Sequence, residues 1–208
     1  MKKLGQMLAV SLLVSGLFLP VSAKEQIATA SGWTIDPAHS SARFSIKHMM
    51  ISNVNGSFGK VSGNVQYDGK NLPKADVDAT IDVASIDTNE PKRDEHLKSK
   101  DFFDVEKYPT ITFKSKKITT TNDGFKILGV LTMHGVSKDI TLDAEPMGPI
   151  VNAHGKTRTG TSATAKINRK DFGISYHQTL DNGGAMVGDD VKITLDVELV
   201  QAEAKPQG

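Results

Sequence analysis

Residues 76–83 are Asp-Val-Asp-Ala-Thr-Ile-Asp-Val, a strict alternation of polar and apolar side chains. Because successive side chains of a β-strand point to opposite faces, this pattern predicts a strand with one buried face and one solvated face. The longest such run, residues 191–199, is Val-Lys-Ile-Thr-Leu-Asp-Val-Glu-Leu. The same period of two recurs along most of the chain, so the sequence predicts an all-β protein.

Eight segments carry this alternation, some less cleanly than others, and are predicted to be strands. They are residues 43–48, 60–67, 76–83, 110–114, 125–133, 139–144, 158–167 and 191–199, with a further short strand at 33–35. Links at residues 122–124 and 133–136 have the composition of hairpin turns and favour antiparallel order. A sheet with one apolar face must close or stack to bury it. We therefore predict an eight-stranded antiparallel barrel, with a two-sheet sandwich as the alternative.

One stretch departs from the period of two. Asn89 is a candidate helix N-cap, and Pro91 suits a first helical turn, so a short helix is predicted near residues 91–99. This helix lies within a long connecting loop from residue 84 to residue 109. The other long connections are residues 146–157 and 168–189.

The composition limits what the protein can do. The chain has 208 residues, enough for one domain, with 25 Lys and Arg against 24 Asp and Glu. This balance lacks the basic excess of nucleic-acid binders. The chain has no Cys, which excludes thiolate zinc sites, iron–sulfur clusters and a cysteine nucleophile. Neither a Gly-x-Gly-x-x-Gly nor a Gly-x-Ser-x-Gly motif is present, and no cofactor is predicted.

The N-terminal residues have the layout of a secretory signal peptide. Lys2 and Lys3 precede an apolar run at residues 7–19, and Val21-Ser22-Ala23 is a small-residue cleavage site. The run is shorter than the roughly 20 residues that span a bilayer, so stable membrane insertion is not expected, although an uncleaved anchor is the alternative. We predict a signal peptide over residues 1–23, cleaved after Ala23, followed by a flexible leader over residues 24–32.

A few polar residues could carry chemistry. Asp36 and His39 could form half of a metal site, but a turn stabilised by local hydrogen bonds is the favoured interpretation. No two His residues have the spacing of paired ligands, and no metal site is predicted. His48 shares a strand face with Phe44 and Ile46 and is expected to point inward, either as a core His or as a group that holds a ligand.

Two further motifs are interpreted as structural features without a role in catalysis or binding. Arg93 and Asp94, on the predicted helix, are interpreted as a structural or solvated ion pair. Residues 55–57, Asn-Gly-Ser, match a glycosylation sequon and are interpreted as a turn. No pair of carboxylates has the arrangement expected for acid–base catalysis.

Several motifs, in order along the chain, resemble one family. They are residues 33–40, Phe44-x-Ile46-x-His48, residues 85–89, Arg93-Asp94-x-His96-Leu97, residues 101–104, Tyr108-Pro109-x-Ile111-Thr112-Phe113, Gly129-x-Leu131-Thr132, residues 135–138, Arg169-x-Asp171-Phe172-Gly173 and Val187-Gly188-Asp189. In this order and spacing the chain resembles the YceI-like, polyisoprenoid-binding periplasmic proteins. The resemblance implies a lipocalin-like barrel over residues 33–200 and a C-terminal tail at 201–208. It also implies an apolar channel for an isoprenoid or other lipid-like ligand, export to the periplasm, and homodimers in some members.

The inward-facing sets of the predicted strands should line this channel. These residues are Phe44, Ile46, His48, Val65, Val77, Ala79, Ile81, Ile111, Phe113, Ile127, Leu131, Ala163, Ala165, Ile167, Ile193, Leu195 and Val197, with Phe102 and Phe103 expected to cap the mouth. The favoured function is a periplasmic carrier that sequesters a molecule with an isoprenoid tail, such as a quinone or polyprenyl lipid, or a long acyl tail. One alternative is an enzyme acting on such a lipid, with His48, His96 or Asp94 as base. Another is a ligand-free module with stress or adhesion partners.

Overall fold

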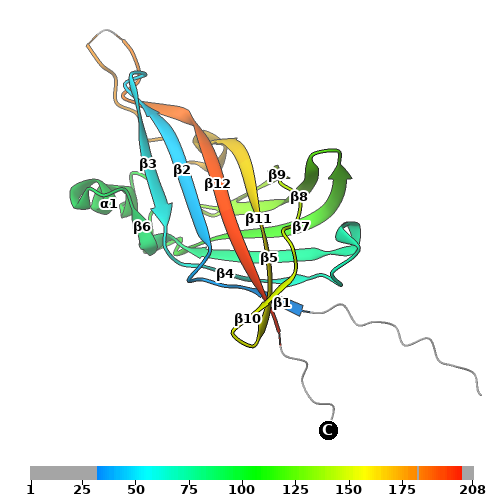
Figure 1. The fold of residues 1–208 in the computed structure, drawn as a ribbon. Helices are drawn as coiled ribbons and strands as arrows, with labels where there is room; N and C mark the ends of the chain where they lie inside the picture. Colours follow the sequence, from blue (N-terminus) through cyan, green and yellow to red (C-terminus); the bar gives the residue numbers. More distant parts are fainter. Residues whose placement is uncertain (1–31, 182, 203–208) are drawn as a thin grey trace, which may run out of the picture.

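The computed structural model describes residues 32–181 and 183–202. The predicted signal peptide lies outside the described residues, as do all but the last residue of the predicted leader and all but the first two residues of the predicted tail. Strands dominate the described part of the chain (Figure 1). They are β1 (Gly32–Ile35), β2 (Ser41–His48), β3 (Ser52–Phe58), β4 (Val61–Gln66), β5 (Asp76–Asp82), β6 (Ile86–Asp87), β7 (Thr110–Thr121), β8 (Gly124–Met133), β9 (Val136–Ala144), β10 (Val151–Ala153), β11 (Lys156–Asn168) and β12 (Val187–Gln201).

Eight of these strands form a closed antiparallel barrel, which confirms the predicted fold. The neighbours around the ring are β1, β4, β5, β7, β8, β9, β11 and β12, and the pairing of β11 with β12 closes it. The short β1 closes the other side, because Trp33 pairs with Val65 of β4 and with Gln201 of β12. Strands β2, β3 and β6 extend from β12 as a branch of the same sheet.

The long β12 makes this branching possible. Its residues 199–201 pair with β1, whereas residues 187–196 pair with β2 on the same edge. Figure 1 shows β2, β3 and β12 running steeply through the view, while β4 and β5 cross at a different angle. The two sets of strands thereby enclose one interior, and the apolar side chains of both sets point into it.

Trp33 anchors the junction between these two sets. Its side chain is only 2% exposed, and its indole Nε1 donates a hydrogen bond to the Tyr67 carbonyl at 2.9 Å. The surrounding core holds the inward residues of every ring strand. A buried Trp with a satisfied N–H combines large apolar burial with fixed orientation, so it holds β1 against the end of β4.

The predicted helix is present as α1 (Pro91–Lys98), but its predicted cap is wrong. The side chain of Glu90, and not that of Asn89, accepts hydrogen bonds from the backbone N–H groups of Lys92 and Arg93. Asn89 instead has a φ of 59° and donates its N–H to Asp87. Asn tolerates the left-handed region better than most residues, so Asn89 suits the position directly before the N-cap residue Glu90.

The prediction of a turn at residues 55–57 is also wrong. These residues lie within β3, which pairs with β2 from Ala42 opposite Phe58 to His48 opposite Ser52. Strand β3 contains few apolar residues, so its alternation is weak, and its ladder with β2 decides its conformation. The short β6 and β10 likewise lie in segments predicted as loops.

The remaining elements are short turns of 3-10 helix. They are η1 (Leu72–Lys74), η2 (Val83–Ser85) and η3 (Arg169–Phe172). The hairpin turns predicted at residues 122–124 and 133–136 are confirmed, because they join β7 to β8 and β8 to β9. Within the described ranges, no helix combines the length and the apolar character needed to cross a bilayer.

Candidate ligand-binding cavity

The barrel encloses a cavity of about 440 Å³. Its walls come from the inward faces of the barrel strands and of β2, together with side chains of α1 and of the segments around Phe102 and Tyr176. Apolar side chains make up nearly all of its surface. This size falls in the range of small-molecule sites, and a wall with few polar groups favours a ligand that is itself mostly hydrocarbon.

All but one of the residues predicted to line a channel do line this cavity. They are Phe44, Ile46, His48, Val65, Val77, Ala79, Ile81, Phe102, Phe103, Ile111, Phe113, Ile127, Leu131, Ala163, Ile167, Ile193, Leu195 and Val197. Their contact with a ligand stays a prediction. Ala165 does not line the cavity but is partly buried and packs against the core. Its cross-strand partner Ile193 does line the cavity.

Sequence reasoning missed part of the wall because β7 is longer than predicted. A register irregularity between Ser115 and Lys117 shifts the phase of alternation in β7. Odd-numbered residues such as Phe113 face inward before it, and the even-numbered Ile118 lines the cavity after it. A β-bulge adds one residue to a strand and so changes which face the following side chains occupy.

Loops contribute further lining residues that strand periodicity could not find. They include Leu72, Ala75, Met147, Ile174, Tyr176 and Met186. Each is an isolated apolar residue in a segment without a regular period. The signal for them is only that apolar residues in loops of a barrel tend to cover its open ends.

An aromatic cluster lies beside the cavity where α1 meets the 174–187 segment. The rings of His96 and Phe102 are 5.1 Å apart, as are those of His96 and Tyr176, and the rings of Phe102 and Tyr176 are 4.7 Å apart. His96 Nε2 also lies 2.9 Å from the Asp101 carboxylate. These contacts fix the positions of Phe102 and Tyr176, which border the cavity.

The charged groups in the cavity wall are all cationic within the described residues: Arg43, Lys47, Arg93 and Arg169 line it, and no Asp or Glu does. Arg169 is 3% exposed, and its guanidinium donates to the carbonyls of Ile174 and Gly188 and to Asp189. All three nitrogens are therefore used in fixing the two ends of the 174–188 segment. This role is structural.

Arg93 and Asp94 also have structural roles, but through a shared partner. Arg93 donates to the Thr88 hydroxyl and carbonyl at 2.8 and 2.7 Å, and Asp94 accepts from the Thr88 N–H at 2.9 Å. Both side chains therefore tie α1 to the chain just after β6. His48 differs, because it lines the cavity and its imidazole ring has no hydrogen-bond or ion-pair partner among the described residues. It is the candidate to meet the polar end of a ligand.

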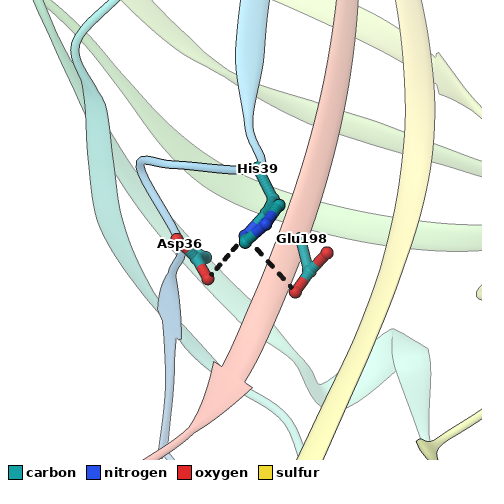
Figure 2. Close-up of side chains that lie close together, drawn as sticks. All are labelled: Asp36, His39 and Glu198. Carbon is teal, nitrogen blue, oxygen red and sulfur yellow. Dashed lines mark hydrogen bonds and ion pairs between the residues drawn. The ribbon is translucent and has the colours of Figure 1, made fainter. Parts of the chain in front are cut away.

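A second cluster of titratable groups lies outside the cavity, where β1 turns into β2. Figure 2 shows Asp36, His39 and Glu198 directed toward one another, and their ligand atoms all lie within 4.8 Å. His39 Nδ1 is 3.1 Å from Asp36 Oδ2 and 3.9 Å from Glu198 Oε1. Asp36 also accepts the Ala38 N–H at 2.9 Å, as the predicted turn requires.

Arg158 supplies the cation of this cluster. Its guanidinium donates to Asp36 Oδ2 at 2.7 Å and to Glu198 Oε1. Together with His39 and the Ala38 N–H, Arg158 holds the pKa of Asp36 well below its usual range. A metal ion would have to compete with this guanidinium for both carboxylates. The arrangement therefore favours a structural junction between β1, β11 and β12 over a metal site.

Comparison with known proteins agrees with this architecture. The YceI-like domain matches residues 33–199. The chain belongs to the YceI-like family. A UPF0312 protein of Staphylococcus aureus strain N315 is 39% identical over 174 residues, covering 83% of this chain and 99% of that protein.

Solved structures of YceI-like and related proteins share the fold. The Campylobacter jejuni YceI protein is 39% identical with a TM-score of 0.64, over 76% of this chain and 91% of that one. Burkholderia cenocepacia BcnA is 25% identical with a TM-score of 0.66, over 79% and 98%. A polyisoprenoid binding domain from Saccharophagus degradans is 14% identical with a TM-score of 0.60, over 84% and 99%, and shows likeness of fold alone.

Proposed function

We propose that this YceI-like protein is a non-enzymatic carrier that encloses the apolar tail of a lipid-like molecule, either an isoprenoid or a long acyl chain. One observation carries the proposal: the 440 Å³ cavity inside the barrel, with its almost wholly apolar wall. A packed core would leave no such volume, because protein interiors close around their side chains. An empty apolar cavity is suited to a hydrocarbon guest.

Burial of the tail supplies the affinity in this proposal. Each CH₂ transferred from water to an apolar wall is worth about 0.8 kcal/mol, so a long tail gains far more than one hydrogen bond to a head group. A polar end at His48 would set the direction of the ligand. The absence of Asp and Glu from the described cavity wall also suits an electron-rich or anionic head group better than a cationic one.

A periplasmic location belongs to the same proposal. It rests on the charged, apolar and small-residue segments of residues 1–23. N-terminal sequencing of the protein from an expressing bacterium should begin at Lys24. A mature chain that still begins at Met1 would remove the support for export.

Organic extraction of natively purified protein, followed by mass spectrometry, tests the function. The proposal predicts an isoprenoid or long acyl lipid at about one molecule per chain. Recovery of a lipid that the protein converts to a product on incubation would favour the enzyme alternative, with His48, His96 or Asp94 as base. Protein that carries no lipid and takes up none would favour an interaction module.

A further inference from the structure

The turn between β2 and β3 presents two large apolar side chains to solvent. Met50 is 65% exposed and Ile51 is 79% exposed. Met49 and Met50 have φ values of 49° and 59°, a region that side chains other than Gly, Asn and Asp rarely occupy. Exposed apolar surface held on a strained turn does nothing for folding and points to a role in contact.

Backbone hydrogen bonds hold this tip in place. The Ile51 N–H donates to the His48 carbonyl at 3.0 Å, and the Met49 N–H donates to the Met186 carbonyl at 2.8 Å. The second bond joins the tip to the 174–187 segment. The outward direction of Met50 and Ile51 is therefore set by the fold.

The tip lies next to the cavity. Lys47 and His48 are its first two residues, the Met186 carbonyl is bonded to its Met49 N–H, and Lys47, His48 and Met186 all line the cavity. Figure 1 shows this turn at the upper end of β2 and β3, opposite the end that carries β10. The tip therefore adjoins the apolar wall of the cavity.

The charge of the hairpin fits an anionic surface. No Asp or Glu occurs between Asp36 and Asp68. The charged residues of β2 and β3 are Arg43, which pairs with Asp196, and Lys47, which has no ion-pair partner among the described residues. Near an anionic bilayer each Lys contributes about 1 kcal/mol of attraction, within a Debye length of the surface.

We propose that the β2–β3 tip, defined as residues 47–51, docks on a bilayer containing anionic lipid, so that a tail passes from the bilayer into the cavity. This inference rests on the proposed carrier function. Two exposed side chains cannot supply the roughly 800 Å² per partner of a standard protein interface. Shallow insertion of two apolar side chains beside a cation is instead sufficient for weak, reversible membrane contact.

Vesicle co-sedimentation tests the docking. Delipidated wild type should bind vesicles of equal parts phosphatidylcholine and phosphatidylglycerol, and bind more weakly at high salt. The variant Met50→Asn/Ile51→Ser, in which Asn suits the left-handed turn, should bind about tenfold more weakly, since two insertions are lost. The matched control, Ile150→Asn/Val151→Ser, removes side chains that are 51% and 46% exposed near β10 and should bind like wild type.

Equal vesicle binding by the tip variant and wild type would overturn the docking, as would no binding by wild type. A second arm separates this failure from failure of the proposed function. Fluorescently labelled geranylgeraniol is offered from solution and from the same vesicles. The tip variant should match wild type from solution and be slower from vesicles. No uptake from solution by wild type would overturn the carrier function, whereas equal rates from vesicles would overturn only the docking.

Discussion

Phe44 covers Gly56 on the inner side of the β2–β3 ladder. A Cβ at Gly56 would lie 2.4 Å from Phe44 Cζ and 2.7 Å from Thr88 Cγ2, closer than non-bonded atoms approach. Gly56 therefore leaves the space that the Phe44 ring occupies in the cavity wall. Gly56 thus has a packing role within β3 and does not form a turn: the Phe44 ring of the paired strand covers the position where Gly56 lacks a side chain.

Gly56→Ala should push Phe44 off its position and lower the free energy of unfolding by about 1–3 kcal/mol, the usual cost of overpacking. Urea unfolding measures this change. Gly59→Ala is the matched control, because no heavy atom lies within 4 Å of its added Cβ. Equal stability of the two variants would show that Phe44 does not depend on this space.

Ala163 and Ala144 are cross-strand partners that differ in one respect: only Ala163 lines the cavity. Ala163→Phe should place its ring in the cavity, changing the unfolding free energy of delipidated protein by less than about 1 kcal/mol and weakening lipid binding. Ala144→Phe has no such space and should cost about 1–3 kcal/mol. Thermal and urea unfolding compare them, and a large loss of stability in delipidated Ala163→Phe would argue against an open cavity.

Among the elements, strands with clean alternation could be predicted from sequence, and β4, β5 and β12 are examples. Strand β3 could not, because Ser, Asn and Gly carry little β preference and its partner β2 determines its conformation. Alternation predicted much of the cavity wall, but it wrongly included Ala165 of β11, and Ile140 and Leu142 of β9 line the wall without having been predicted. The bulge in β7 and the loop residues around Tyr176 required the three-dimensional structure, because no local pattern encodes them.

The junction of β1, β11 and β12 is expected to depend on pH through Asp36. Its pKa is lower in the folded protein than the ordinary 3.8, so ionised Asp36 contributes stability above that value and loses it as the pH falls through the folded pKa. Arg158→Gln should therefore lower the melting temperature at neutral pH. The difference from wild type should shrink in strong acid, and a pH-independent difference would contradict this account.

The same junction is expected to be independent of metal, because the Arg158 guanidinium already pairs with both Asp36 and Glu198. EDTA should leave the melting temperature of wild type unchanged, as measured by differential scanning fluorimetry with and without added Zn²⁺. A marked fall with EDTA that Zn²⁺ reverses would identify Asp36, His39 and Glu198 as a metal site.

At the scale of the whole molecule, closure of the sheet creates the cavity. Eight apolar strand faces turn inward around a volume that their own side chains do not fill. Alternation along each strand predicted a barrel with an apolar interior. It could not predict the volume of the cavity, because this volume depends on the tilt of the strands and on which loops cover the ends of the barrel.

Titration of delipidated protein with polyprenols of increasing chain length tests the central claim most directly. If the cavity binds a tail by burial, affinity measured by calorimetry should rise at least about tenfold for each added isoprene unit and then level off when the cavity is full. Salt should have little effect on this rise. Affinity that does not change with chain length, or no binding at any length, would contradict the account.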